Sequence, residues 1–413
     1  MHKDNQNILN SLPALISNTF PIPAKFKNKL PHDIRELSHL LTNRRGERSL
    51  SYLTRPNFLS AYLHYFLPWN LYRLCLLLPT LDISLSRNDT ITDLGCGPLT
   101  FASALWISRP ELRKLPLEIN CIDRSGPVLE AGKKFFNALC GNTANGNATG
   151  DKENPWKINL IKEDIDIRKF KKTAHQKRKP AALVCAVNMF NEIYENISHN
   201  NREGLRLMAE KAALYMNSEA AANASILTVE PGVPQSGKFI SLLRDEFIKL
   251  KRLPSSPCTH TGPCPFIGKT AGAIRGRNWI DTKKRWCHFA FEAYDAPREL
   301  LKLSAAAKLP KDRLVLSYLY TKEIITETLR TSGSRHGGNG NGGARIISDS
   351  FPLPDNIYGR YGCSENGLIL VTGNRERIEN LNSLSHVPQN KLVEFSANNQ
   401  YDKKSGALIK GIK

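Results

Sequence analysis

The stretch ITDLGCGP, residues 91–98, decides the fold of this chain, because an apolar run stops there at a glycine pair. Glycine has no Cβ, so Gly95 and Gly97 permit a tight turn and a close approach of the backbone to a ligand. Ligands of open α/β sheets bind at the carboxyl ends of the strands. A strand that ends at Asp93-Leu94-Gly95 therefore predicts a binding site for a nucleotide-like ligand.

Four more apolar runs follow, at residues 117–123, 157–165, 181–188 and 225–232, with helical stretches between them. Short runs that are apolar throughout are typical of parallel strands buried on both faces. Strands that alternate with helices predict a doubly wound, Rossmann-like α/β domain.

The second run ends at Asp123, where a carboxylate can accept hydrogen bonds from both hydroxyls of a ribose. The D-x-G-x-G ending of the first run resembles the first motif of class I S-adenosylmethionine-dependent methyltransferases, and not the longer G-x-G-x-x-G of dinucleotide-binding proteins. This resemblance implies that S-adenosylmethionine is the ligand. The implied contacts to its methionine and ribose portion come from Asp93, Gly95, Cys96 and Gly97, with Asp123 on the ribose.

The third and fourth runs carry less information. By the same resemblance, Asp164 lies where an acidic residue meets the adenine, although an exposed helix N-cap is an equally good interpretation of this residue. The fourth run continues as Val187-Asn188-Met189-Phe190-Asn191-Glu192, which lacks the Asn-Pro-Pro-aromatic motif of amino-group methyltransferases. No residue in this region indicates a general base, so the catalytic residues stay unassigned.

The remaining organisation follows from periodicity and composition. Apolar residues recur three and four apart between residues 28 and 82, with Pro68 at a boundary or kink, which predicts an N-terminal helical domain. Polar stretches at 141–155 and 332–343 indicate surface insertions or a flexible linker. We therefore expect four parts: a helical domain (1–85), the methyltransferase-like core (86–250), a Cys-rich insertion that returns to the core (251–330), and a linker with a C-terminal extension (331–413).

Charge and composition narrow the class of partner. The 413 residues include 58 Lys and Arg against 38 Asp and Glu, a net charge of +20, which favours a polyanionic partner such as nucleic acid. Seven of the basic residues lie between Arg168 and Pro180, in a solvated loop or a phosphate-contacting patch. Apolar runs are too short to span a bilayer, and the first 30 residues contain no Arg and no signal-peptide pattern. We expect a cytoplasmic monomer that does not enter a membrane.

Three cysteines lie close together beyond the fifth run: Cys258, Cys264 and Cys287, in a segment rich in Pro and Gly. Thiolates repel one another and are costly to bury, so such a group usually neutralises its charge on a metal or cluster. Cys363 is a fourth candidate. The spacing leaves three alternatives open: a 4Fe-4S cluster, a zinc site completed by His260 or His288, and free thiols. The other five cysteines, at 75, 96, 121, 140 and 185, are expected in the core.

Four motifs together resemble a known family. They are Asp93–Pro98, Glu230-Pro231-Gly232, Pro257-Cys258 with Cys264-Pro265, and Trp286-Cys287-His288-Phe289. In this order they resemble the methyltransferase-like assembly factors of the small ribosomal subunit in bacteria and mitochondria, over roughly residues 50 to 370. The resemblance implies a 4Fe-4S cluster on Cys258, Cys264, Cys287 and Cys363, and small-subunit rRNA as the partner.

Two functions fit these expectations. The first is an rRNA-binding assembly or translation factor of the small ribosomal subunit, whose cofactor and cluster shape the fold. The second is an active S-adenosylmethionine-dependent rRNA methyltransferase. Basic charge supports both, since phosphate contacts supply affinity without sequence information. The missing acceptor motif favours the first.

Overall fold

The computed structural model describes residues 3–42, 52–144, 154–170, 178–194, 197, 201–267, 286–324, 343–394, 400–403 and 405–412. The chain divides into two compact units. The first is formed by Met1–Ser198, Glu219–Ala221 and Phe291–Leu314, and the second by His199–Ser218, Ala222–Ala290 and Val315–Lys413.

A parallel sheet forms the centre of the first unit, as the apolar runs predicted. Its strands are β1 (Thr90–Leu94), β2 (Leu117–Asp123), β3 (Trp156–Lys162) and β4 (Ala181–Val187), in the spatial order β3-β2-β1-β4. The pairs β1–β2, β1–β4 and β2–β3 are all parallel. Strand order reverses between the adjacent strands β1 and β4, and in such folds ligands bind in the crevice at the carboxyl ends of the strands beside this point. This is the class I methyltransferase-like arrangement.

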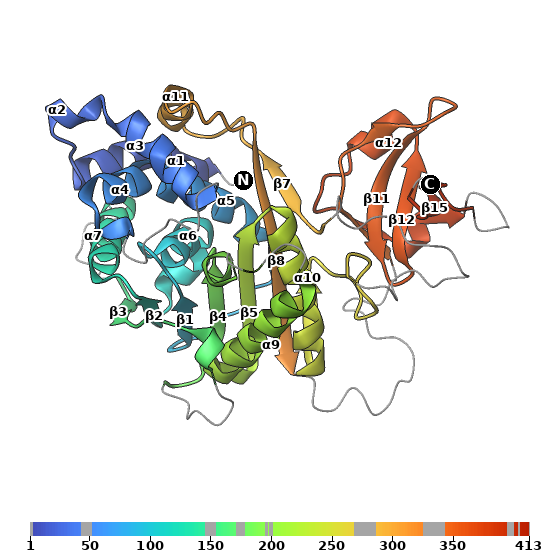
Figure 1. Cartoon of the computed structure of the whole chain (residues 1–413), viewed down its shortest axis with the longest axis horizontal. Coiled ribbons are helices and arrows are strands. Elements are labelled where there is room, and N and C mark those ends of the chain that lie inside the picture. Colours follow the sequence, from blue (N-terminus) through green and yellow to red (C-terminus); the bar gives the residue numbers. More distant parts are fainter. Residues whose placement is uncertain are drawn as a thin grey trace. The chain divides into compact units, whose positions relative to one another are not determined.

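Helices of the N-terminal segment lie beside α6 (Thr100–Ser108) and α7 (Gly126–Ala144) (Figure 1). Pro68 is the second residue of α5, and a π-helical turn at Tyr62–Phe66 leads into it with helical backbone throughout. Pro68 therefore lies inside a helical stretch, where a π-helical turn passes into an α-helix, and no boundary lies there. The helices of the first unit are α1 (Lys3–Thr19), α2 (Ala24–Lys27), α3 (Leu30–Thr42), α4 (Pro56–Ala61), α5 (Leu67–Leu77), α6 (Thr100–Ser108), α7 (Gly126–Ala144), α8 (Phe190–Ile193) and α11 (Arg298–Ala306).

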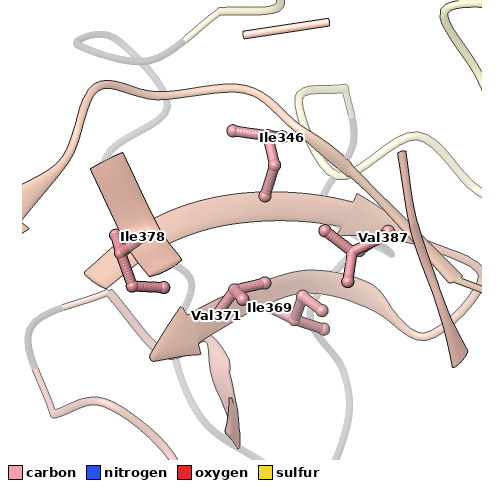
Figure 2. Close-up of a cluster of buried hydrophobic side chains, with 6 residues drawn as sticks. Ile346, Ile369, Val371, Ile378 and Val387 are labelled. Atoms are coloured by element: carbon pink, nitrogen blue, oxygen red, sulfur yellow. The ribbon is translucent and has the colours of Figure 1, made fainter. Parts of the chain in front are cut away.

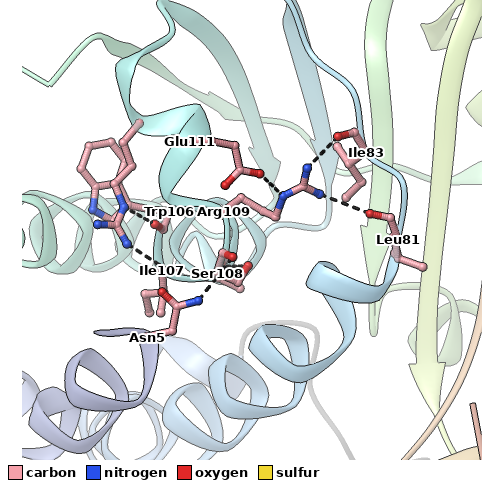
Figure 3. A network of polar contacts seen from close by, with 10 residues as sticks. Asn5, Leu81, Ile83, Trp106, Ile107, Ser108, Arg109 and Glu111 are labelled. Atoms are coloured by element: carbon pink, nitrogen blue, oxygen red, sulfur yellow. Dashed lines mark hydrogen bonds and ion pairs between the residues drawn. The ribbon is translucent and has the colours of Figure 1, made fainter. Parts of the chain in front are cut away.

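The carboxyl end of α6 is closed by side chains from other segments (Figure 3). Arg113 donates to the carbonyls of Trp106 and Ile107 at 2.6 and 3.0 Å, and Asn5 of α1 donates to the Ser108 carbonyl at 3.4 Å. The last carbonyls of a helix have no partner within it, so these bonds satisfy them and join α1 to α6. None of the described helices is both long and apolar enough to cross a bilayer.

The second unit contains antiparallel strands and two long helices. Strand β8 (Arg313–Ile324) pairs with β5 (Ala220–Pro231) on one side and with β6 (Arg252–Ser256) on the other. Helix α10 (Pro234–Lys249) joins β5 to β6, α9 (Arg202–Glu219) precedes β5, and β7 (Phe289–Glu292) follows the Cys-rich segment. The run predicted at 225–232 is the second half of β5.

From Gly343 onward the chain forms a separate sheet, where the sequence predicted only a linker and an extension. Its core consists of Ala344, Ile346, Ile369, Val371, Ile378 and Val387 (Figure 2). The order is β13-β9-β11-β12-β15-β14, with β10 beside β11. The elements are β9 (Gly343–Ile346), β10 (Phe351–Pro352), β11 (Tyr358–Ser364), β12 (Gly367–Gly373), α12 (Arg375–Glu379), β13 (His386–Pro388), β14 (Leu392–Glu394) and β15 (Leu408–Ile412).

Candidate functional site

The glycine turn after β1 has the conformation that its sequence predicted. Gly95 has φ +63° and Gly97 has φ +55°, a region that residues with a Cβ adopt at a cost. A Cβ on Gly95 would lie 2.7 Å from Cγ of Met189, whereas a Cβ on Gly97 would meet nothing within 4 Å. Gly95 therefore gives room to its neighbour, while Gly97 faces open space.

Asp123 holds this turn to the end of β2. Its Oδ2 accepts from the Gly97 N–H at 3.0 Å, and its Oδ1 accepts from the Ser125 N–H at 2.9 Å. Burial raises the pKa of Asp123, and these two N–H groups oppose the rise. A carboxylate has about four lone-pair positions, so Asp123 can accept further hydrogen bonds while it holds the turn.

Asp93 lies deeper than the other predicted residues and is fully buried. The Cys185 thiol donates to its Oδ1 at 3.3 Å, while its Oδ2 has no hydrogen-bond partner among the described residues. Burial raises the pKa of Asp93 to about 8. Burial therefore favours the protonated form of this carboxyl group.

A cavity of ≈ 230 Å³ opens at the carboxyl ends of the parallel strands. Five of the six predicted cofactor residues line it, namely Gly95, Cys96, Gly97, Asp123 and Asp164. The end of β4 adds Asn188, Met189 and Glu192, and the N-terminal segment adds Tyr52, Tyr62 and Asn70. The structure thus brings together residues that the sequence placed on three separate strand ends.

Asp164 lies on the cavity wall after β3, and its residue is exposed. The alternative interpretation as a helix N-cap is wrong, because the cap of the following 3-10 turn is Asp166, whose side chain accepts from the Arg168 N–H at 3.1 Å. That side chain also bonds the Arg168 guanidinium, which lowers the pKa of Asp166. A contact of Asp164 with adenine stays a prediction.

Sequence reasoning missed the side chains that join the N-terminal segment to the cavity. Glu192 accepts from Tyr52 Oη at 3.2 Å and from the Arg124 guanidinium at 3.1 Å. Arg73 of α5 donates to Asn188 Oδ1 at 3.2 Å. Arg124 follows Asp123 directly and could have been found at the strand end, whereas no motif in the sequence marks Tyr52 or Arg73.

The basic run of Arg168–Pro180 is described only in part, because residues 171–177 lie outside the described residues. Of its four described Lys and Arg side chains, three have acidic partners. Arg168 and Lys169 pair with Asp166, and Arg178 bridges Glu163 and Glu219 at 2.8 and 3.0 Å. These three support the solvated or structural interpretation more than the phosphate-contacting one.

The four predicted metal ligands all belong to the second unit. Cys258 and Cys264 follow β6, Cys287 precedes β7, and Cys363 lies on β11. Burial raises the pKa of each thiol, to about 11 for Cys264. Charge on the other three cysteines raises the pKa of Cys287 further, so the four side chains lie within electrostatic reach of one another.

As predicted for core residues, Cys75, Cys96, Cys121, Cys140 and Cys185 are buried.

One face of α10 supports these thiols. Gly237, Ser241 and Arg244 are spaced four and three residues apart, which places them on the same side of a helix. A Cβ on Gly237 would lie 2.6 Å from Trp286 Cδ1 and 2.8 Å from the Cys287 carbonyl oxygen. Gly237 therefore allows the Trp286-Cys287 segment to lie against the helix.

The two histidines of this region differ. His260 is buried, and its Nε2 lies 3.3 Å from Cys363 Sγ. Burial lowers the pKa of His260 to about 4, with a smaller contribution from Arg244. His288 stacks on Trp286, and its Nδ1 lies 3.0 Å from the Trp286 carbonyl. Of the two, His260 is the one that the structure places beside a predicted ligand.

The donor chemistry and the geometry of this site point in different directions. The site offers four thiols and the buried guanidinium of Arg244, whose Nε has no hydrogen-bond partner among the described residues. These groups suit an anionic, thiolate-bound ligand. Within the described ranges, however, no three Cys, His, Asp or Glu side chains are placed so that they could share a metal ion. The residues thus suit such a group in kind, and the ligand geometry is not formed.

Comparisons with known proteins found likenesses to solved structures alone. No protein-family model matches the chain, and no curated protein matches it. Among solved structures, it is similar to a Listeria monocytogenes protein assigned to the class I S-adenosylmethionine-dependent methyltransferases (10% identity, 79% of this chain and 88% of that one, TM-score 0.32). It is also similar to plantazolicin methyltransferase in complex with S-adenosylhomocysteine (16%, 78% and 98%, 0.26) and to a chain of the fibrillarin/Nop5p complex (11%, 62% and 82%, 0.29). At these TM-scores the likenesses carry no information about substrate.

Proposed function

We propose that this chain binds S-adenosylmethionine in the cavity of the first unit and serves as an rRNA-binding assembly factor of the small ribosomal subunit. The first half rests on one observation: the Gly97 N–H donates a hydrogen bond to Asp123, and both residues line the cavity. The turn leaves open space beside Gly97, and the remaining lone pairs of Asp123 can accept from the ribose hydroxyls. Asp164 on the same wall is available to the adenine amino group.

The second half of the proposal is supported by charge and by the motif resemblance. A net charge of +20 favours binding to a polyanion. The Cys-rich motifs are the most specific part of the resemblance to the small-subunit assembly factors. By that resemblance the four cysteines of the second unit hold a 4Fe-4S cluster, with zinc as the alternative, which ties the Cys258–Cys264 segment to β11.

Calorimetric titration with S-adenosylmethionine tests the cofactor site. We expect binding by the native chain and loss of binding on Asp123→Ala, since the ribose then loses its acceptor. The matched control is Asp166→Ala, which removes a cavity carboxylate that pairs with Arg168. Absence of binding by the native chain would contradict the cofactor assignment.

Crosslinking in cells, followed by sequencing of the bound RNA, tests the partner. We expect enrichment of small-subunit rRNA over large-subunit rRNA and tRNA. Equal recovery of all RNA classes would mean that the charge serves nonspecific binding, and the assembly-factor proposal would be wrong.

Elemental analysis of anaerobically purified protein tests the cluster: we expect iron and sulfide, and zinc without iron would select the alternative.

An active rRNA methyltransferase is the second candidate, because Asn188 and Glu192 bring polar groups from the end of β4 into the cavity. Transfer of tritium from labelled S-adenosylmethionine to small subunits from a deletion strain decides between the two. The assembly-factor proposal expects no incorporation above background. Incorporation that is lost with Gly95→Arg protein would establish the enzyme.

A further inference from the structure

Helix α2 and the residues on either side of it form an exposed basic corner of the first unit. Residues 23–29, with the sequence PAKFKNK, are all exposed and include three lysines and no acid. Phe26 is 45% exposed, and Lys25 Nζ lies 5.0 Å from the centre of its ring. A large ring thus stays in water between lysines, outside the core of this unit.

The pairing of a cation with a ring occurs twice more beside this corner. Lys134 Nζ of α7 lies 5.4 Å from the ring centre of Phe20, which directly precedes the segment 21–23 that leads into α2. The guanidinium of Arg55, the N-cap of α4, lies 5.6 Å from the ring centre of Phe58. Both rings are partly exposed, so each cation–ring pair reaches the surface.

Two hydrogen bonds connect α4 to the end of the basic corner. Asn57 Nδ2 of α4 donates to Asp33 Oδ1 at 3.4 Å, and the Asp33 N–H donates to the Lys29 carbonyl at 3.0 Å. The three cation–ring pairs therefore belong to one surface. This surface is here called the basic aromatic patch, and it consists of residues 23–29, Phe20, Arg55, Phe58 and Lys134.

The positive charge of the patch is not neutralised within the described part of the chain, where none of its Lys and Arg side chains forms an ion pair. The side chain of Asp33 is 22% exposed and accepts from Asn57. Glu130, one turn before Lys134 on α7, is exposed and does not pair with it. By contrast, three cations of the run 168–180 have acidic partners. The charge of the patch is therefore available to a partner.

Single-stranded RNA matches this combination of groups. Cations bind phosphates, and exposed aromatic rings stack on unpaired bases. The bases of a duplex are already stacked on one another, so they are not open to Phe26 in this way. A membrane would need an apolar helix face to bury, whereas α2 has four residues with Phe26 as its one large apolar side chain.

We propose that the basic aromatic patch binds single-stranded RNA, with Lys25, Lys27 and Lys29 on phosphates and Phe26 stacked on an unpaired base. The inference rests on the proposed function for RNA as the class of partner. It adds to that function the surface of the first unit that makes the contact.

Fluorescence anisotropy on the full-length protein tests the patch, with labelled oligouridine and a labelled RNA duplex of the same length as probes. We expect Phe26→Ala to bind oligouridine roughly 5- to 150-fold more weakly and the duplex with native affinity. The double variant Lys25→Gln/Lys27→Gln should reduce the slope of log affinity against log salt by about 1.4, because each lost phosphate contact removes about 0.7.

The matched control is Lys114→Gln/Lys157→Gln, which removes two exposed lysines just before β2 and at the start of β3 and should leave the slope unchanged. Native oligouridine affinity in Phe26→Ala, or a slope of Lys25→Gln/Lys27→Gln equal to that of the control, overturns the inference. Binding of the native chain to vesicles of phosphatidylserine and phosphatidylcholine, without binding to oligouridine, also overturns it.

The results separate the inference from the function beneath it. If the patch variants lose oligouridine binding while crosslinking in cells does not enrich small-subunit rRNA, the inference stands and the proposed function is wrong. Enrichment of small-subunit rRNA, together with native oligouridine affinity in both patch variants, overturns the inference alone.

Discussion

At the scale of single residues, the glycine turn shows that two glycines of one motif have different physical roles. At Gly95, Met189 occupies the space that a side chain would take, whereas a side chain at Gly97 would meet no neighbour, because this residue lines the cavity. Both have positive φ, so alanine strains the backbone at either position by about 1–2 kcal/mol. The two positions separate folding from binding.

Gly95→Ala should lower Tm more than Gly97→Ala, because a Cβ at Gly95 also displaces Met189 from 2.7 Å. Gly97→Ala should fold with a modest loss of Tm and bind S-adenosylmethionine at least roughly tenfold more weakly, since about 1.4 kcal/mol of steric conflict suffices for that factor. Thermal unfolding and calorimetry measure the two effects. Native affinity in Gly97→Ala would show that the ligand does not approach this turn.

Asp93→Asn should flatten the dependence of stability on pH. An unfolded Asp loses its proton near pH 3.9, whereas folded Asp93 keeps its proton to about pH 8. The protonated Asp93 side chain contributes to the free energy of unfolding in full below about pH 3.9. This contribution falls by about 1.4 kcal/mol per pH unit as the pH rises to about 8. The free energy of unfolding in urea should therefore favour the variant increasingly from about pH 4 to pH 8. A constant difference between the two proteins would show that Asp93 is ionised when folded.

At the scale of elements, the sequence predicted the parallel strands well and the C-terminal strands not at all. Strands β1, β2 and β4 coincide with continuous apolar runs because both faces of each are covered. Strands β13 and β14 have three residues each, too short to show a period. The cavity was also predicted only in part. Sequence motifs mark its strand ends, but no motif marks Tyr52, which bonds Glu192 from 140 residues away.

Gly237→Ala should disturb the thiol segment, because the new methyl group would meet Trp286 and the Cys287 carbonyl inside 3 Å. We expect lower Tm and less bound iron per chain. Gly141→Ala is the matched control: this glycine also lies on a helix, α7, but a Cβ there meets nothing within 4 Å, so alanine should be neutral or stabilise by up to about 1 kcal/mol. Full iron content in Gly237→Ala would show that α10 does not support the cysteines.

At the scale of the whole molecule, the two candidate sites belong to different units. The residues that line the cavity lie in the first unit, and the four cysteines lie in the second. The predicted division near residues 85, 250 and 330 remains a proposal, since both units are built from interleaved segments. The net charge of +20 belongs to the chain as a whole, so the proposed binding to RNA should weaken steeply as salt is added.

Separate units predict separable ligands. Cys258→Ser should lose iron, because it removes one thiolate of the proposed four, and should bind S-adenosylmethionine within about threefold of the native affinity, a difference below about 0.7 kcal/mol. Gly97→Ala should show the converse: weakened cofactor binding at native iron content. Calorimetry and iron analysis on the same preparations check both. If Cys258→Ser instead loses cofactor affinity by tenfold or more, the two sites are coupled, and the cluster would govern when the cofactor binds.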